Sequence, residues 1–467
     1  MLAALIFRRA FTGWCAALAF IGSNLLIRSA VSAVGKYNVV KYTNLVSMLF
    51  TNELLGSHHN LFWFGVPVSR IWVESLAAVL MCTAFVTIFI YIFTFGQILP
   101  PEHKKPFFPF FKFKAKINAS TLVGQEIHKL LIINGAVWVL LLFVGIQVYA
   151  SVIRESYIGI NEIYYREYMT RLSGRFTQEK LDWLNTEQEK FEPIFLLDAE
   201  LAKGNITEEQ HESLMAHYAS LQTELEVFKR IVSKKIGYLS ENPDAHLVYD
   251  SGYSFLFGIT GEKDMEDALW AGLISAVCFA SFFAMEKSTG MLRVIQATPL
   301  GRQSTVWAKS KICWGIATFI AVMTLLPRAW QVGHDYQYSS IFSPAMSLEY
   351  FQRLPSCVPI LVIILLLLFT RIIACFSTAM TVLFISYKLG NTLGAIFTSS
   401  LLFCVGPLLS FCGVIDAKWI SIYPLFHFAA LQAETMTSVI SWIYLLLYFA
   451  IGVICQSYLL EHFGEAF

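Results

Sequence analysis

The residues best suited to chemistry lie in one polar segment, Met285 to Lys311, which stands between two hydrophobic stretches. Its basic side chains are Lys287, Arg293, Arg302, Lys309 and Lys311. Because basic loops stay on the inner side of a membrane, they predict a cytoplasmic position. Thr298-Pro299 supplies an N-cap followed by proline at the first helical position, which predicts a new helix starting there. Such a helix is suited to docking a soluble partner; the alternative is an ordinary solvated connector.

Motifs for catalysis or metal binding are missing from the sequence. It has no GxxxxGK[ST] phosphate loop, no HExxH and no nucleophile elbow. Leu172-Ser173-Gly174 superficially resembles an ABC signature, but no phosphate loop accompanies it. His58-His59 and the pair His211 and His217 lack the i, i+4 spacing of metal ligands. We therefore predict no catalytic residue, no metal ligand and no directly bound cofactor.

Composition indicates an integral membrane protein. Hydrophobic residues form 56% of the chain and charged residues only 14%, far from a soluble profile. The nine cysteines lie in or beside apolar stretches, without a CxxC pair, and read as small buried hydrophobes. The net charge of +1 gives no reason to expect nucleic-acid binding. Arg8-Arg9 precede a long apolar stretch without an obvious cleavage site, so we expect a first span rather than a cleaved signal.

A window of about 20 residues predicts roughly eight membrane spans. They cover about 12–33, 72–97, 131–152, 267–285, 310–327, 357–386, 392–412 and 437–460. The basic stretch 103–116, the 285–311 loop and Lys388 fall on one side, which places both termini in the cytoplasm. Before the third of these spans, the basic and aromatic stretch Phe107–Leu131 predicts an amphipathic elbow helix along the inner membrane surface. A simple basic flank is the alternative.

Arg154 to Glu266 is a hydrophilic insert that this topology places outside. Its second half predicts a long amphipathic helix, because apolar residues recur every three or four positions: Leu214, Tyr218, Leu221, Leu225, Phe228, Val232, Ile236 and Leu239. Thr207 and Gln210 predict a capping box at its start. A partner helix over about Thr177–Lys203, bent at Pro193, would complete an antiparallel hairpin. The apolar seam is then an internal contact or, alternatively, a docking face.

Two further segments connect spans on the outside. Val414 to Glu434 is too apolar for a free loop and predicts a re-entrant or interfacial segment, in which His427 is a packed histidine rather than a ligand. Its order of span, apolar patch and span is echoed in the first hundred residues. This repeat concerns hydropathy alone, and internal repeats are common in transporters.

Charges inside the predicted spans are few. Glu74, Arg28 and Arg371 are the main exceptions, and a proton- or sodium-coupled carrier normally needs acidic or broken-helix sites at mid-membrane. The sequence therefore predicts that energy comes from outside the chain.

The run Glu286-Lys287-Ser288-Thr289-Gly290-Met291-Leu292, then Ala297-Thr298-Pro299-Leu300-Gly301-Arg302, then Lys309, resembles the cytoplasmic loop of ABC transporter permeases of the type-2 export class. That family shows a Glu, a following Gly, a Thr-Pro pair with a nearby Arg, and a Lys opening the next span. Lys309 is followed here by Ser-Lys, where the family more often continues directly into apolar residues. The resemblance covers about residues 105–467, and the family's usual unit has six spans, two fewer than here.

The resemblance implies a permease unit that works with a second permease half, as a homo- or heterodimer, above separate ATPase subunits that use ATP. Contact with the ATPase would involve Arg293–Arg302 and the elbow around Gln125, Glu126 and Lys129. Glu286 and Gly290 would end one span's helix, Thr298 and Pro299 would start the coupling helix, and Arg302 would face the ATPase.

The sequence thus predicts an all-α polytopic protein of a bacterial plasma membrane, with about eight transmembrane helices and an extracytoplasmic helical hairpin. Residues 1–98 resemble the end of a preceding permease half. This favours a chain that is the later part of a longer tandem permease; the alternative is a variant whose first hundred residues echo a previous half. Residues 99–153 hold the basic linker, the elbow and the first core span. The external domain covers 154–266, and five further spans with coupling loop 286–311 cover 267–467. The predicted function is that of an ABC exporter permease subunit; a membrane-anchored sensor or scaffold and a secondary transporter are the alternatives.

Overall fold

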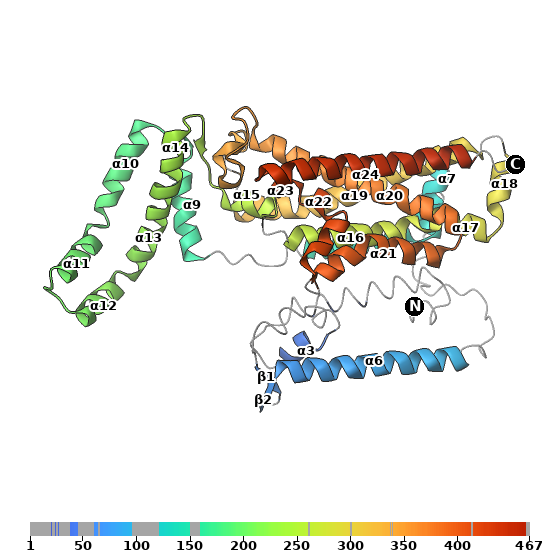
Figure 1. The fold of residues 1–467 in the computed structure, drawn as a ribbon, viewed down its shortest axis with the longest axis horizontal. Coiled ribbons are helices and arrows are strands. Elements are labelled where there is room, and N and C mark those ends of the chain that lie inside the picture. Colours follow the sequence, from blue (N-terminus) through green and yellow to red (C-terminus); the bar gives the residue numbers. More distant parts are fainter. Residues whose placement is uncertain are drawn as a thin grey trace.

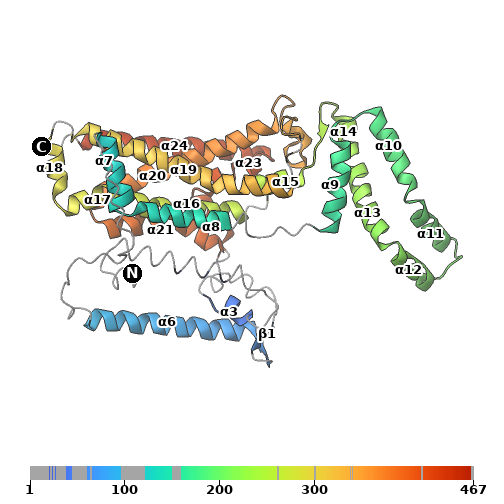
Figure 2. The ribbon, with the colours of Figure 1, turned by 180° about the vertical axis from the view of Figure 1, so that it is seen from behind.

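The computed structural model describes residues 38–44, 60–63, 66–95, 121–149, 159–259, 262–298, 301–336, 340–411 and 414–463, with residues 20, 24, 27 and 338. Most of them form helices (Figures 1 and 2). A bundle of long helices has a helical hairpin at one end and the short helix α18 (Met291–Ala297) at the other. We call these the hairpin end and the α18 end.

Six helical segments of the described residues are long and apolar enough to cross a membrane. They are Arg70–Ile88 within α6 (Arg70–Phe95), Lys263–Ser288 formed by α16 (Glu262–Phe279) and α17 (Ser281–Ser288), α19 (Gln303–Asp335), α20 (Ile360–Leu389), Thr392–Ser410 within α21 (Thr392–Phe411), and α24 (Thr435–His462). A bent pair, Leu122–Ile133 with Ala136–Val148, raises the number to 7 if it is one span. The chain is therefore a helical membrane-embedded protein. The first of the eight predicted spans, 12–33, lies almost wholly outside the described residues.

The first helix of the bent pair lies at the end of the predicted elbow stretch, of which residues 107–120 are outside the described residues. Helix α7 (Leu122–His128) is capped by Thr121, whose hydroxyl accepts from Gly124 N at 3.2 Å. It continues into the π-helix η2 (Lys129–Ile133), and Gly135, at φ 73°, then turns the chain into α8 (Ala136–Val148). The left-handed conformation at Gly135 favours glycine and accounts for the 67° bend.

Helix α18 lies earlier in the chain than predicted. Gly290, at φ 74°, ends the turn after α17, and α18 starts directly at Met291. Thr298, expected to start a helix, instead ends one: its backbone is extended at φ −87° and ψ 148°, as is usual for a residue before proline. Pro299 itself lies outside the described residues. The prediction of a helix beginning at Thr298-Pro299 is wrong. Gly290, eight residues before Thr298, allows the chain to turn, and the short helix begins there.

The hydrophilic insert folds as a helical hairpin. One arm contains α10 (Gln178–Glu189) and α11 (Glu192–Ala202), and the other contains α12 (Glu208–His217) and α13 (Ala219–Arg230). Beyond them lie η4 (Ile231–Ile236) and α14 (Gly237–Glu241), packed beside α9 (Ile160–Leu172). The capping box at Thr207 and Gln210 is confirmed, and Pro193 stands in the first turn of α11, after the break from α10.

The predicted apolar seam of the hairpin is only partly confirmed. Three of its residues are buried: Leu225, Phe228 and Leu239. Leu214 and Val232 are exposed, because the helix breaks at Tyr218 and the π-helix η4 shifts the period, so that Ile231 is buried in place of Val232.

The base of the hairpin is fastened to the end of α19. Arg166 Nη1 of α9 donates to Asp335 O at 3.4 Å, and the Tyr249 and Tyr336 rings lie 6.3 Å apart. Helix α15 (Ser251–Leu256) packs on α19 so closely that a Cβ at Gly252 would stand 2.7 Å from Tyr336 Cβ. The short strands β3 (Gly174–Arg175) and β4 (His246–Leu247) pair in the same region, next to η5 (Ala345–Ser347) and η6 (Glu349–Phe351), where His246 N donates to Ser347 Oγ at 2.9 Å.

Residues 415–432, which we call the connecting segment, join α21 to α24. They form η7 (Ile415–Ile420), α22 (Tyr423–Phe426) and α23 (Phe428–Leu431), and almost all side chains from Ser421 to Gln432 are buried. In the first hundred residues, the corresponding region contains α3 (Asn38–Tyr42) and two antiparallel strands, β1 (Asn60–Trp63) and β2 (Val66–Ser69). In the residues that the structure describes, the two regions thus differ in local structure.

Substitution of Gly252 by Ala should loosen the hairpin from α19. The added methyl group would overlap Tyr336 and touch Val332 Cγ1 at 3.1 Å, and overpacking of this kind costs about 1–3 kcal/mol. Thermal unfolding in detergent should show the loss. Gly237→Ala is the matched control, because nothing lies within 4 Å of its Cβ position and alanine favours a helix. Equal stability of the two variants would contradict the close attachment.

Candidate functional site

Lys309 of α19 is the centre of a charge cluster at the α18 end. Its side chain has 0% exposure, and its Nζ donates to Phe282 O at 2.7 Å. The same atom lies 2.9 Å from Glu286 Oε1 and 3.4 Å from Glu126 Oε2. A lysine without contact to water requires such counter-charges, because burial of an unpaired ammonium is very costly.

Lys129 of η2 completes the cluster. Its Nζ donates to Glu126 Oε1 and to Glu286 Oε1, both at 2.6 Å. Glu286 thus binds two lysines from different parts of the chain, and two positive charges balance two negative ones. The π-helical turn at Lys129–Ile133 presents this lysine, in agreement with the frequent occurrence of such turns at functional sites.

The cluster joins α7, α17 and α19. Four residues singled out in the sequence come together here, two from the elbow and two from the coupling loop: Glu126, Lys129, Glu286 and Lys309. Glu286 lies buried in the last turn of α17, two residues before this helix ends at Ser288. These four side chains contact each other rather than a surface, so they hold the elements around α18 together.

The break between α16 and α17 is fixed from α20. Ser386 Oγ donates to Ala280 O at 2.6 Å and accepts from Phe283 N and Ala284 N at 3.2 and 3.0 Å. The Phe283 ring in turn lies 4.6 Å from Lys309 Nζ, a distance that suits a cation–π contact. These hydrogen bonds hold α17, the helix that precedes α18 in the chain, against α20.

The remaining predicted contact residues lie at the surface around α18. Gly290, Arg293, Thr298 and Arg302 are exposed, as is Gln125 of α7. Arg302 Nε donates to Gln296 O at 3.3 Å, and Gln296 Nε2 donates to Phe463 O at 3.0 Å. These two bonds fix α18 to the start of α19 and the end of α24.

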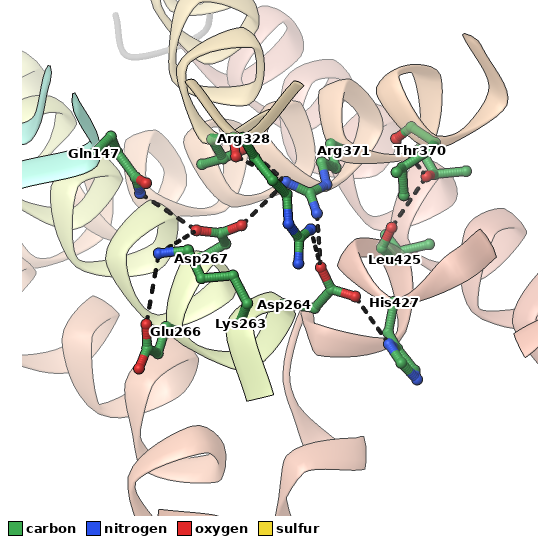
Figure 3. A network of polar contacts seen from close by, with 12 residues as sticks. Gln147, Lys263, Asp264, Glu266, Asp267, Arg328, Thr370, Arg371, Leu425 and His427 are labelled. Carbon is green, nitrogen blue, oxygen red and sulfur yellow. Dashed lines mark hydrogen bonds and ion pairs between the residues drawn. The ribbon is translucent and has the colours of Figure 1, made fainter. Parts of the chain in front are cut away.

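A second buried network, drawn in Figure 3, joins the start of α16 to α19 and α20. Asp264 and Asp267 of α16 and the arginines Arg328 and Arg371 have between 0% and 1% exposure. Asp264 Oδ1 accepts from Arg328 Nη1 at 2.7 Å and from Arg371 Nη2 at 2.8 Å. Arg371 Nη1 lies 3.2 Å from Asp267 Oδ2. We call these four residues the Asp–Arg network.

Neighbouring polar groups extend this network (Figure 3). Gln147 Nε2 of α8 donates to Asp267 Oδ1 at 3.5 Å, and Lys263 Nζ lies 3.8 Å from the same oxygen. His427 of the connecting segment contacts Asp264 Oδ2 through Nδ1 at 2.9 Å. Thr370 Oγ1 donates to Leu425 O at 3.0 Å.

Most of the Asp–Arg network was not predicted from the sequence, and the prediction that the spans hold almost no buried acids is wrong. Asp264 was expected in the hydrophilic insert, and the predicted spans began at 267 and ended at 327, one residue before Arg328. Helix α16 starts at Glu262 and α19 continues to Asp335. The i, i+3 spacing of the two aspartates was a usable signal, because it places both carboxylates on one helix face.

The arrangement can position the helices that it joins. In the Asp–Arg network, two carboxylates face two guanidinium groups, so each acid is neutralised by a permanent positive charge. No group of three or more His, Cys, Asp or Glu that could hold a metal ion is found among the described residues. Both charge clusters connect helices that are distant in sequence, and the ion pairs fix the positions of these helices relative to one another.

Lys309→Met should destabilise the bundle strongly. The variant leaves Glu126 and Glu286 facing Lys129 alone, and removal of one partner from a buried charge group costs about 3–5 kcal/mol. Thermal unfolding in detergent would measure the loss, with Lys311→Met as control because Lys311 is exposed. A second substitution, Glu286→Gln, should recover part of the loss in a double-mutant cycle. Independent, additive effects would show that the two residues do not act as a pair.

Comparison with known proteins gives no family for this chain. No protein-family model, no curated protein and no solved structure matches it. Its function must therefore be inferred from its own residues and their geometry.

Proposed function

We propose that this chain is the transmembrane permease subunit of an ATP-driven ABC exporter and couples to a separate ATPase subunit through residues 286–311. The observation that carries the proposal is α18, a short helix that presents an exposed face at one end of the bundle while the charge cluster around Lys309 holds the elements behind it.

The exposed face of α18 is suited to a protein partner. Met291 and Val294 are 52% and 58% exposed, and Arg293 beside them is also exposed. Leu292 and Gln296 point the other way and are buried. A solvated connector has no need of two large apolar side chains in water, whereas interfaces are enriched in methionine and arginine.

The attachment of α18 allows it to transmit a displacement. Gln296 and Arg302 bond it to α24 and α19, so α18 cannot shift without moving them. Glu286 and Lys309, which precede and follow α18 in the chain, bind Lys129 and Glu126 of the elbow, respectively. A partner that pushes on α18 would therefore also move the elbow.

The element order supports the same proposal. A bent entry helix, a span, an inserted domain, a span, a short helix and four further spans follow one another from α7 to α24. In the proposed topology the α18 end is cytoplasmic, because it carries the basic loop, and the hairpin is extracytoplasmic. Both termini would be cytoplasmic in a bacterial plasma membrane. The chain would form a homo- or heterodimer with a second permease half. Membrane lipid would be a further partner. The ATPase subunit would use the ATP.

A secondary carrier remains the less favoured function even though the bundle contains buried acids. Asp264 and Asp267 are both held by arginine, at distances of 2.7 to 3.2 Å. Carboxylates in such pairs are held by fixed positive charges, whereas an ion-coupled carrier must release and rebind its ion. A sensor or scaffold would work through the hairpin and would need no ATPase.

Val294→Asp should abolish most of the ATPase association. A carboxylate placed in the apolar centre of an interface would cost at least about 2 kcal/mol, or more than tenfold in affinity. The measurement is co-purification of the tagged chain from its native host in mild detergent, with quantitative mass spectrometry of P-loop ATPases. Val232→Asp on the hairpin is the matched control, because Val232 is exposed at the other end of the molecule.

Arg293→Glu should weaken the same association, and its effect is easier to interpret than that of Arg302→Glu. Arg302 also bonds Gln296 O, so its replacement would loosen α18 as well as change the charge. Undiminished ATPase recovery with both Val294→Asp and Arg293→Glu would contradict docking on α18. If the intact wild-type chain brings no ATPase with it, the permease function itself is wrong, and a sensor or scaffold acting through the hairpin becomes the better proposal.

A further inference from the structure

The connecting segment closes the hairpin end of the bundle. It packs against α16, α20, α21 and α24, and a Cβ at Gly406 of α21 would stand 2.8 Å from Ala417 O. Its helices α22 and α23 have four residues each, too short to be stable alone. Contacts with the bundle therefore decide its position.

Two polar contacts tie the middle of this segment to the bundle. Thr370 Oγ1 donates to Leu425 O, and His427 contacts Asp264. Between them, Phe426 lies under Arg371, with the guanidinium carbon 5.1 Å from the ring centroid. Both ties thus reach the segment from the region of the Asp–Arg network (Figure 3).

The direction of the histidine contact follows from the charges around it. Asp264 is bound by two guanidinium groups through Oδ1 and so is an ionised carboxylate, which only accepts hydrogen bonds. His427 must therefore donate through Nδ1–H to Oδ2. A hydrogen bond to a charged acceptor is about twice as strong as a neutral one.

The contacts of Asp264 differ in what their loss would cost. If either arginine left, a buried charge would lose a partner. If His427 left, Asp264 would keep both arginines and the network would stay neutral. The bond from His427 is thus the one that can break without unpaired charge inside the bundle.

We propose that His427 is a positioning residue that latches the connecting segment over the hairpin end of the bundle through Asp264, and that release of this bond opens that end. The arginines form the fixed frame of the latch, and Thr370 is its second attachment. As a gate, the latch rests on the proposed transport function; as a contact that sets the position of the segment, it does not.

The test is a distance measurement between spin labels at Ile420→Cys and Phe342→Cys. These positions are 81% and 77% exposed, one in the connecting segment and one in the loop before α20. The full-length chain would carry the labels in a background whose nine cysteines are replaced by Ala or Ser. The wild-type latch should give one distance. His427→Phe should add a longer one, with the open fraction raised roughly ten- to hundredfold, as expected from the loss of a hydrogen bond to a charge.

Two variants separate a latch from a general loss of stability. His427→Asn retains an N–H donor near the position of Nδ1 and should restore most of the closed population. His334→Phe is the matched control, since His334 is 68% exposed and its ion pair is with Asp335, outside the network. Thr370→Val should increase the open fraction further when combined with His427→Phe.

An unchanged distance distribution in His427→Phe would overturn the proposal, and so would a lower melting temperature without a longer distance, because the contact would then only support the fold. None of these measurements needs the ATPase. The latch can be present in a chain that co-purifies with no ATPase, and absent from one that does co-purify with an ATPase. The latch proposal and the permease proposal can therefore fail independently.

Discussion

The cost of burying charge in an apolar bundle is the constraint on which this structure depends. The helices bury charged side chains at two levels along the bundle, the cluster around Lys309 and the Asp–Arg network. In each, the charges are balanced by residues on other helices. Since removal of one partner leaves a buried charge alone, each cluster favours arrangements of its helices that keep the charge partners together. Apolar packing holds the bundle together, while the charges determine the register of its helices.

Helix α19 connects the two levels. Lys309 and Arg328 lie about five turns apart on it, roughly 28 Å along the axis, close to the roughly 30 Å thickness of a bilayer's hydrocarbon core. Trp307 and Trp330 are exposed near the same two levels, where tryptophan commonly marks the membrane interface. The charge clusters therefore fall near the edges of the apolar layer, where burial of a charge is less costly than at its centre.

The same helix links the α18 end to the hairpin end. Its start is bonded to α18 through Arg302 and Gln296, and its end carries the hairpin through Asp335 and Tyr336. A displacement of α18 in a permease would thus reach both the hairpin and, through Arg328, the region that holds the connecting segment. The backbone hydrogen bonds of this helix resist local bending, except at Pro327, next to Arg328, where proline has no N–H to donate.

Local signals in the sequence predicted much of the secondary structure. The long apolar runs gave the membrane-embedded class, and Thr207 and Gln210 located the start of a hairpin helix through a capping box that needs only neighbouring residues. Other local features were misjudged where two signals competed. Thr298 before Pro299 resembled a helix start, but Gly290 had already started the helix, and the π-turn at Ile231 moved the hairpin seam by one position.

By itself, the sequence determined that this is a helical membrane protein with a polar hairpin and a basic loop, because composition and periodicity act through neighbouring residues. Only the tertiary structure decided which charges meet. Glu286 and Lys129 are 157 positions apart, and Arg371 and Asp264 are 107. Such contacts depend on how whole helices pack, so a carboxylate that seemed to belong to a solvated insert, Asp264, proved to be a buried centre of the bundle.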